Sequence, residues 1–150
     1  RLAHPAMAVT TDLIVGFPGE GEAEFAESLA FVQRMEFAAG HVFSFSPRPG
    51  TPAALYSGQV PPGERKKRSA LMRAVLAESA VCYRQPFVGQ TLAVLWEVSR
   101  QNTAGVWQME GLTSNYLRVS APAPRNLWNE ISRVNLGALS EDGLQGQILD

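Results

Sequence analysis

The stretch that decides the fold is TDLIVGFPGEGEAEF, residues 11–25. Its apolar and β-branched beginning stops at the Gly/Pro turn of residues 16–20, so residues 9–17 are predicted to form a strand. Glu22 and Glu24 follow at once, where the positive end of a helix dipole favours anions. The sequence therefore predicts a strand, a tight turn and a helix in immediate succession.

Apolar residues at helical spacing continue the pattern beyond the turn. A helix over residues 22–35, with Gly21 at its N-cap, is predicted because apolar side chains recur every three or four positions at Phe25, Leu29, Val32 and Met35. GHVFSF, residues 40–45, then reads as a second strand. A strand, a helix and a strand in this order predict a βαβ unit with parallel strands.

The rest of the chain has three kinds of sequence pattern in succession. Residues 46–64 are rich in proline and predict an ordered loop. A long helix is expected over residues 64–84, with an inner stripe at Leu71, Val75 and Cys82. After Pro86, short apolar segments separated by turn residues predict a small β-barrel. These segments are FVGQTLAVLWEV, GVWQME, NYLRV, NEISRVNLGAL and GLQGQILD.

Composition indicates a globular protein with a basic section. Of the 150 residues, 45% are hydrophobic and 18% charged, and the net charge is −1. Residues 65–133 nevertheless hold ten basic and four acidic side chains, which indicates a polyanionic partner. The single cysteine, Cys82, fits a reducing compartment such as the cytoplasm. No apolar run is long enough for a membrane helix, no signal peptide is visible, and the start at Arg1 indicates a piece of a longer protein.

The two strand ends are the candidate ligand positions. In parallel α/β structures, ligands bind where strands end, and glycines let them approach the backbone closely. The turn at residues 16–20 is therefore either one wall of a ligand site or a purely structural turn. His4 and His41 are interpreted as packed, and Cys82 as a core residue. No Walker loop, Ser/His/Asp set or paired carboxylates are present, so the chain lacks a complete set of catalytic residues.

Five segments in this order resemble one known family. They are TDLIVGFPGEGEAEF, HVFSFSPRPGTPAA, RKKRSALM, FVGQTLAVLWE and GLTSNYLRV. Together they are similar to the C-terminal half of the radical-SAM tRNA methylthiotransferases. GLTSNYLRV resembles most the branch that acts on threonylcarbamoyladenosine beside the anticodon.

The resemblance implies an α/β plus all-β fold in three parts. Residues 1–62 would be the C-terminal portion of a partial TIM-like radical-SAM barrel. Residues 63–85 would be a linking helix, and residues 86–150 a small TRAM barrel that binds RNA. The family's [4Fe–4S] clusters, one of which binds and cleaves S-adenosylmethionine, need cysteine thiolates. This chain has only Cys82, so it should hold no cluster and be inactive by itself.

The resemblance also implies site residues. Those implied to line the S-adenosylmethionine pocket are Gly16, Phe17, Pro18, Gly19, Glu20, Phe45, Ser46 and Pro47. Those expected to contact a tRNA anticodon stem-loop, through phosphates or base stacking, are Arg65, Lys66, Lys67, Arg68, Trp107, Asn115, Tyr116 and Arg118. The charge run and the two aromatics have an alternative interpretation as a solvated helix face and barrel core. The sequence departs from the family at Gly21, at Ser44 and Phe45, and in the sparsely charged SAPAPRNLWNE.

Other functions remain open at this point. If the chain is not part of an enzyme, it would be a stand-alone RNA-binding module or a plain α/β ligand-binding domain without catalysis. Two parallel strands also cannot close a barrel, so residues 9–45 are expected to associate through their exposed edge or to be disordered in isolation.

Overall fold

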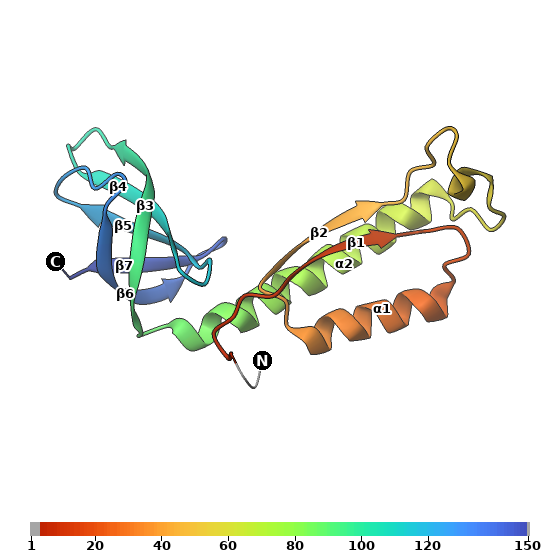
Figure 1. The fold of residues 1–150 in the computed structure, drawn as a ribbon, viewed down its shortest axis with the longest axis horizontal. Helices are drawn as coiled ribbons and strands as arrows, with labels where there is room; N and C mark the ends of the chain where they lie inside the picture. Colours follow the sequence, from red (N-terminus) through yellow and green to blue (C-terminus); the bar gives the residue numbers. More distant parts are fainter. Residues whose placement is uncertain (1–3, 150) are drawn as a thin grey trace. The chain divides into compact units, whose positions relative to one another are not determined.

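The structure is a computed structural model that describes residues 4–149, which divide into two compact units. The α/β unit spans Val9–Tyr83, and the barrel unit comprises residues 84–149 together with residues 4–8. Figure 1 shows both long helices in the α/β unit. In chain order the elements are β1 (Thr10–Val15), α1 (Glu22–Met35), β2 (Ala39–Ser44), a 3₁₀ turn (Pro52–Leu55), α2 (Pro62–Arg84), a second 3₁₀ turn (Gln85–Phe87), β3 (Thr91–Gln101), β4 (Trp107–Thr113), β5 (Arg118–Ala123), β6 (Ile131–Leu139) and β7 (Leu144–Ile148).

The predicted βαβ unit is confirmed. Strands β1 and β2 pair in parallel, with Leu13 opposite Val42 and Ile14 opposite Phe43. One face of this two-stranded sheet packs on both helices (Figure 1). The buried members of that core are Val15, Phe25, Val32, Phe37, Met72 and Leu76. Because a strand alternates its side chains between two faces, Ile14 and Phe43 lie on the opposite face and are exposed.

Helix α1 has the predicted bounds. Gly21 is its N-cap, and Glu24 accepts a hydrogen bond at 3.0 Å from the Gly21 backbone N–H. This is the half of a capping box that does not need a side chain at the N-cap. The helix ends where Glu36 adopts a left-handed backbone conformation, with φ of 47°. The local sequence therefore determines both ends of α1.

The buried face of α2 differs from the predicted stripe. Leu71 is 55% exposed and Cys82 is exposed, so their assignment to the inner stripe, and of Cys82 to the core, is wrong. The buried side chains are instead Arg68, Ser69, Met72, Leu76, Ser79 and Tyr83. Polar groups occupy this face because they have partners, as Ser79 shows by donating to the Phe37 carbonyl at 3.1 Å. Helix α2 thus packs as part of the α/β unit over most of its length.

The predicted small barrel is present as five strands that close in the order β3-β4-β5-β7-β6. Its largest fully buried side chain is Trp96, whose indole N–H donates to Ser132 Oγ at 3.1 Å. Other core side chains include Val94, Met109, Val119, Val134, Leu136 and Leu144. Closure leaves no open sheet edge around the ring of strands. In the part of the chain that the structure describes, no helix is long and apolar enough to span a membrane.

The uncovered face of the β1–β2 sheet leads to the first prediction. Ile14 is 58% and Phe43 is 53% exposed, and the two are register partners. A chain of residues 1–150 produced alone should self-associate because two adjacent large apolar side chains face water. Replacing both by serine should shift sedimentation toward the monomer. Leu55→Ser, at an 88% exposed residue outside the sheet, is the matched control. A monomeric wild type whose β1 and β2 amides resist hydrogen exchange would contradict this.

Candidate functional site

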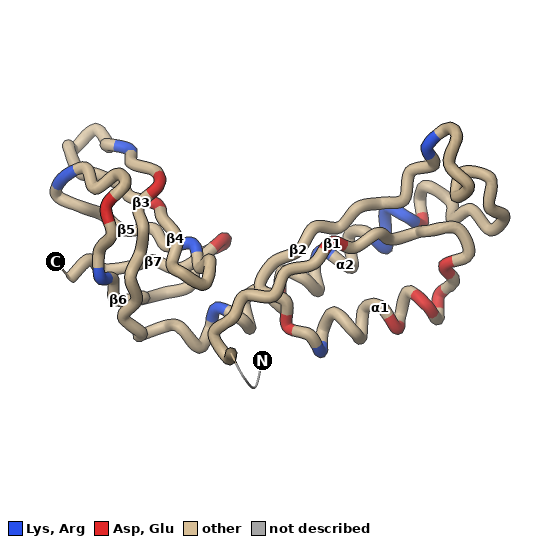
Figure 2. Tube along the Cα trace, viewed as in Figure 1, with Lys and Arg blue, Asp and Glu red and all other residues tan. Residues whose placement is uncertain are grey.

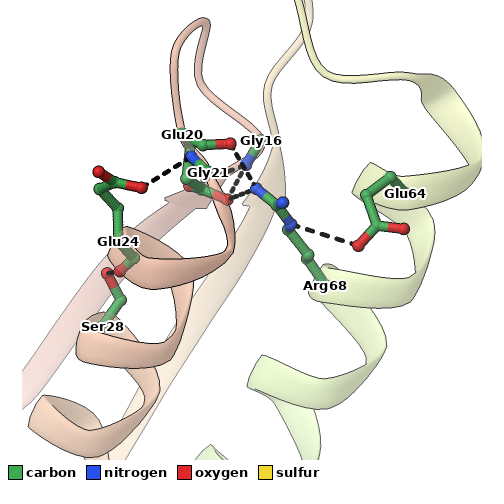
Figure 3. Close-up of polar contacts among 7 residues, drawn as sticks. All are labelled: Gly16, Glu20, Gly21, Glu24, Ser28, Glu64 and Arg68. Carbon is green, nitrogen blue, oxygen red and sulfur yellow. Dashed lines mark hydrogen bonds and ion pairs between the residues drawn. The ribbon is translucent and has the colours of Figure 1, made fainter.

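The turn after β1 satisfies its own backbone. Both carboxylate oxygens of Glu20 lie 3.0 Å from the Gly16 N–H that donates to them (Figure 3). The Glu20 N–H donates to the Phe17 carbonyl, and the Gly19 N–H donates to the Gly58 carbonyl, both at 2.9 Å. Gly16 and Gly19 have positive φ values of 71° and 88°, which glycine adopts without a Cβ clash. These three N–H groups are therefore engaged within the protein and are not directed at a ligand.

A buried ion pair ties this turn to α2. Arg68 Nη1 lies 2.6 Å from Glu20 Oε1 and also donates to the Glu20 carbonyl at 2.8 Å (Figure 3). Arg68 Nε lies 3.4 Å from a carboxylate oxygen of Glu64, and the guanidinium stands 5.2 Å from the centre of the Phe25 ring. The hydrogen bond with Glu20 raises the pKa of Arg68 above its ordinary value, against the effect of burial. Arg68 therefore holds the turn and is not free to contact RNA phosphate.

Arg65 joins the two strand ends. Its guanidinium donates to the Phe45 carbonyl, directly after β2, and its aliphatic stem occupies the space where a Cβ on Gly16 would lie. Phe45 in turn donates its N–H to the Val15 carbonyl at 2.8 Å. Gly16 is thus required both for its backbone conformation and for the close approach of Arg65.

Beside these contacts lies an open cavity of about 370 Å³. Its lining residues come from the end of β2 and the first turns of α2: Ser44, Phe45, Ser46, Pro47, Pro62, Arg65, Lys66, Ser69 and Arg73. Figure 2 shows basic residues gathered at the start of α2 and acidic residues along α1. The cavity brings together two sets that the sequence assigned separately, to S-adenosylmethionine and to RNA. Arg73 and Ser69 were missed, although Lys66, Ser69 and Arg73 have the spacing of one helix face.

Aromatic rings form the other exposed part of this end of the unit. Phe17 is 42% exposed, and its ring centre lies 5.1 Å from that of Phe45 and 6.3 Å from that of Tyr56, both edge-to-face. Edge-to-face packing of this kind stabilises the arrangement beyond simple burial. The turn therefore offers a ligand the exposed ring of Phe17 more than hydrogen-bond donors.

In the barrel unit, the predicted RNA residues differ in their availability. Tyr116 is 77% exposed and has a left-handed backbone with φ of 60°, and Arg118 beside it is also exposed. Asn115 is engaged in the turn, since its Oδ1 accepts from the Thr113 hydroxyl at 2.6 Å. Trp107 is only half-buried. Tyr116 and Arg118 are thus the accessible pair at this turn.

A further aromatic in the barrel unit was not among the predicted site residues. Trp128 is 62% exposed in the loop before β6. In the same loop Arg125 makes a two-pronged ion pair with Glu130, at 2.6 and 2.7 Å. This hydrogen bonding lowers the pKa of Glu130 below its ordinary value. The ion pair helps to fix the loop that carries Trp128. Trp128 was not predicted as a site residue because this loop carries few charges for a segment that binds RNA.

Residues 4–149 do not offer a set of ligands for an iron–sulfur cluster. Among the described residues, no three His, Cys, Asp or Glu side chains are grouped closely enough to hold a metal ion. The one thiol, on Cys82, is exposed on α2. An iron–sulfur cluster needs several thiolates, and the described residues supply one.

Comparison with known proteins gives relatives along almost the whole chain. Threonylcarbamoyladenosine tRNA methylthiotransferase MtaB of Thermotoga maritima is 36% identical over 147 residues, which is 96% of this chain and 32% of that protein. tRNA-2-methylthio-N(6)-dimethylallyladenosine synthases are 33% identical in both Maricaulis maris and Bacillus pumilus. The match covers 99% and 98% of this chain, and 32% and 28% of those proteins, respectively. No protein-family model matches the chain.

An α/β unit with two adjacent strand ends and a separate closed barrel therefore aligns throughout with one class of tRNA-modifying enzyme. The chain belongs to the tRNA methylthiotransferase family. It spans about a third of the length of the curated relatives that it matches.

Proposed function

We propose that the protein containing this chain is a tRNA methylthiotransferase, and that this chain forms its C-terminal third. The enzyme would replace the C2 hydrogen of a modified adenosine beside the anticodon by a methylthio group. The observation that carries the proposal is an alignment over 96–99% of the chain with one enzyme named a tRNA methylthiotransferase and two named tRNA-2-methylthio-N(6)-dimethylallyladenosine synthases. Two notable parts of the structure, the turn before α1 and the cavity after β2, lie within the aligned residues.

The family implies S-adenosylmethionine and iron–sulfur clusters as cofactors of the intact protein. When bound, they supply the radical chemistry and the sulfur and methyl transfer. We assign the cluster ligands to the part of the protein outside residues 1–150. The exposed ring of Phe17 fits an apolar contact with a nucleoside such as the adenosyl group. We keep residues 16–20 and 45–47 as the candidate wall of that pocket.

The two units would have separate roles. We assign the α/β unit to the closing strands of a TIM-like barrel, with Ile14 and Phe43 on the face that other strands of the intact protein would cover. We assign the five-stranded barrel to RNA binding as a TRAM domain. Tyr116 is exposed for stacking on an unpaired base and Arg118 for a phosphate contact. Trp107 remains a weaker stacking candidate because it is half-buried.

The proposed substrate is the anticodon stem-loop of a cytoplasmic tRNA that carries threonylcarbamoyladenosine. The stretch GLTSNYLRV supports this choice over dimethylallyladenosine. The relative named for threonylcarbamoyladenosine is 36% identical to this chain, and a relative named for dimethylallyladenosine is 33% identical. The experiment must therefore distinguish the two substrates.

Nucleoside analysis of tRNA from cells that lack the protein tests this function. Mass spectrometry of digested tRNA should show loss of the 2-methylthio form of threonylcarbamoyladenosine, and threonylcarbamoyladenosine without the methylthio group should accumulate. Re-expression of the intact protein should restore the methylthio form. Loss of the dimethylallyladenosine derivative instead would correct the substrate, and an unchanged profile of both would contradict the function.

A further inference from the structure

The cavity between β2 and α2 is strongly cationic. Three of its lining residues, Arg65, Lys66 and Arg73, carry positive charge, and none carries negative charge. Among the described residues, neither Lys66 nor Arg73 has a carboxylate within ion-pair distance, whereas Arg68 and Lys67 both pair with Glu64. The cavity therefore holds positive charge that the described part of the chain does not neutralise, which favours an anionic occupant.

The side chains in the cavity are arranged to donate hydrogen bonds. Arg73 Nη1 donates to Ser69 Oγ at 2.6 Å, which fixes the guanidinium beside the cavity. Ser69 is 3% exposed, so this support for Arg73 is itself buried. Ser44 and Ser46, from the end of β2, also line the cavity. Guanidinium, ammonium and hydroxyl groups together match the oxygens of a phosphate group.

The helix itself adds to the argument. Lys66 lies in the first turns of α2, which begins at Pro62 at the rim of the cavity. A helix N-terminus carries partial positive charge, so cations there are unfavourable for the free helix. A bound anion would offset the side-chain charges of Arg65, Lys66 and Arg73. A volume of about 370 Å³ is at the small end of the range for ligand pockets and suits one phosphate with part of its sugar.

We propose that this cavity binds one backbone phosphate of the substrate RNA through Lys66 and Arg73, with Ser69 positioning Arg73. This inference rests on the proposed function, because the RNA supplies the phosphate. It gives residues 44–46 a role in lining a phosphate site, beside any contact of Phe45 with a cofactor. Arg65 contributes its charge while its guanidinium stays bound to the Phe45 carbonyl.

The test is binding of an anticodon stem-loop by the intact protein across a salt series. Lys66→Ala and Arg73→Ala should each weaken binding by at least about tenfold and lower the salt slope by about 1, since each removes a charge-assisted contact. Ser69→Ala should weaken binding less and leave the slope nearly unchanged. The matched control is Arg34→Ala, which removes an exposed cation at the far end of α1.

Neutral methylphosphonate linkages, placed one at a time in the stem-loop, identify the phosphate. One position should weaken binding by wild type but not by Arg73→Ala, because the contact is already lost in the variant. If wild type binds the stem-loop while Lys66→Ala and Arg73→Ala match Arg34→Ala at every linkage, the phosphate site is wrong and RNA binding stands. If wild type itself does not bind the stem-loop, the proposed RNA substrate fails, and the phosphate site fails with it.

Discussion

Arg68→Ala is expected to lower the free energy of unfolding of the α/β unit by about 3 kcal/mol. The substitution leaves the Glu20 carboxylate, which is only 14% exposed, without its cationic partner. Removing one member of a buried ion pair costs about 3–5 kcal/mol, and the lower end applies because Gly16 N–H still donates to Glu20. The turn after β1 should loosen first, because Arg68 also holds the Glu20 carbonyl.

Two spectroscopic signals separate this effect from the rest of the chain. All three tryptophans, Trp96, Trp107 and Trp128, lie in the barrel unit, whereas α1 and nearly all of α2 lie in the α/β unit. Urea unfolding of residues 1–150 produced alone, followed by helical circular dichroism, should therefore shift in Arg68→Ala, and the same unfolding followed by tryptophan fluorescence should not. Arg34→Ala, which removes an exposed charge, should change neither.

The double variant Arg68→Met with Glu20→Gln tests the cause. It removes both charges at similar side-chain volume, so much of the lost stability should return. An Arg68→Ala variant that unfolds at the wild-type urea concentration would mean that the pair contributes little. No recovery in the double variant would mean that the loss comes from the other hydrogen bonds of the guanidinium, such as the one to the Glu20 carbonyl, and not from the stranded carboxylate.

Trp96→Ala should destabilise the barrel unit by about 3–5 kcal/mol. Trp96 is fully buried, so its removal leaves a large cavity between strands that close on one another. It also leaves Ser132, which is 6% exposed, without its indole partner. Nothing in a closed ring of five short strands can collapse far enough to fill that volume.

The fluorescence of Trp107 and Trp128 follows this unfolding in the variant. The urea midpoint of the fluorescence change should fall while the helical signal of the α/β unit keeps its own midpoint. Trp128→Ala is the matched control, since Trp128 is 62% exposed and its loss should be within about 0.5 kcal/mol of neutral. Equal midpoints for Trp96→Ala and Trp128→Ala would contradict the assignment of Trp96 as the centre of the barrel core.

Much of the fold could be predicted because each element carries its own pattern. In the strands, apolar residues alternate because one face of each strand is buried. In α1, Phe25 and Val32 have helical spacing because both are buried on the same face. The left-handed Gly16 likewise follows from local chemistry. For these elements, the local conformational preference of the residues agrees with the pattern of burial, so the sequence alone is sufficient to predict them.

Helix α2 could not be predicted in the same way. An apolar pattern selects Leu71 and Cys82 for the interior, whereas the structure buries Arg68, Ser69 and Ser79. Arg68 and Ser79 are buried because partners from distant parts of the chain satisfy them: Glu20 lies 48 residues from Arg68, and Phe37 lies 42 residues from Ser79. The spacing of residues along α2 does not reveal a partner that lies so far away in the sequence.

The candidate site shows the same limit. A run of four cations, residues 65–68, looks uniform in sequence, yet each member has a different role. Arg65 bonds to the Phe45 carbonyl, Lys66 lines the cavity, Lys67 is 77% exposed, and Arg68 is buried in an ion pair. The position on the helix decides these roles, and two turns along from Lys66 the same face carries Arg73.

The measurement that tests the account most directly is methylthio transfer by the purified intact protein. Its clusters are reconstituted without oxygen. The protein is then incubated with a low-potential one-electron reductant, a sulfide source, S-adenosylmethionine bearing an isotopically labelled methyl group, and tRNA that carries threonylcarbamoyladenosine. We predict a 2-methylthio nucleoside that contains the labelled methyl group in the digested tRNA. A protein with its full complement of clusters that leaves the adenosine at C2–H, in this tRNA and in tRNA carrying dimethylallyladenosine, would contradict the account.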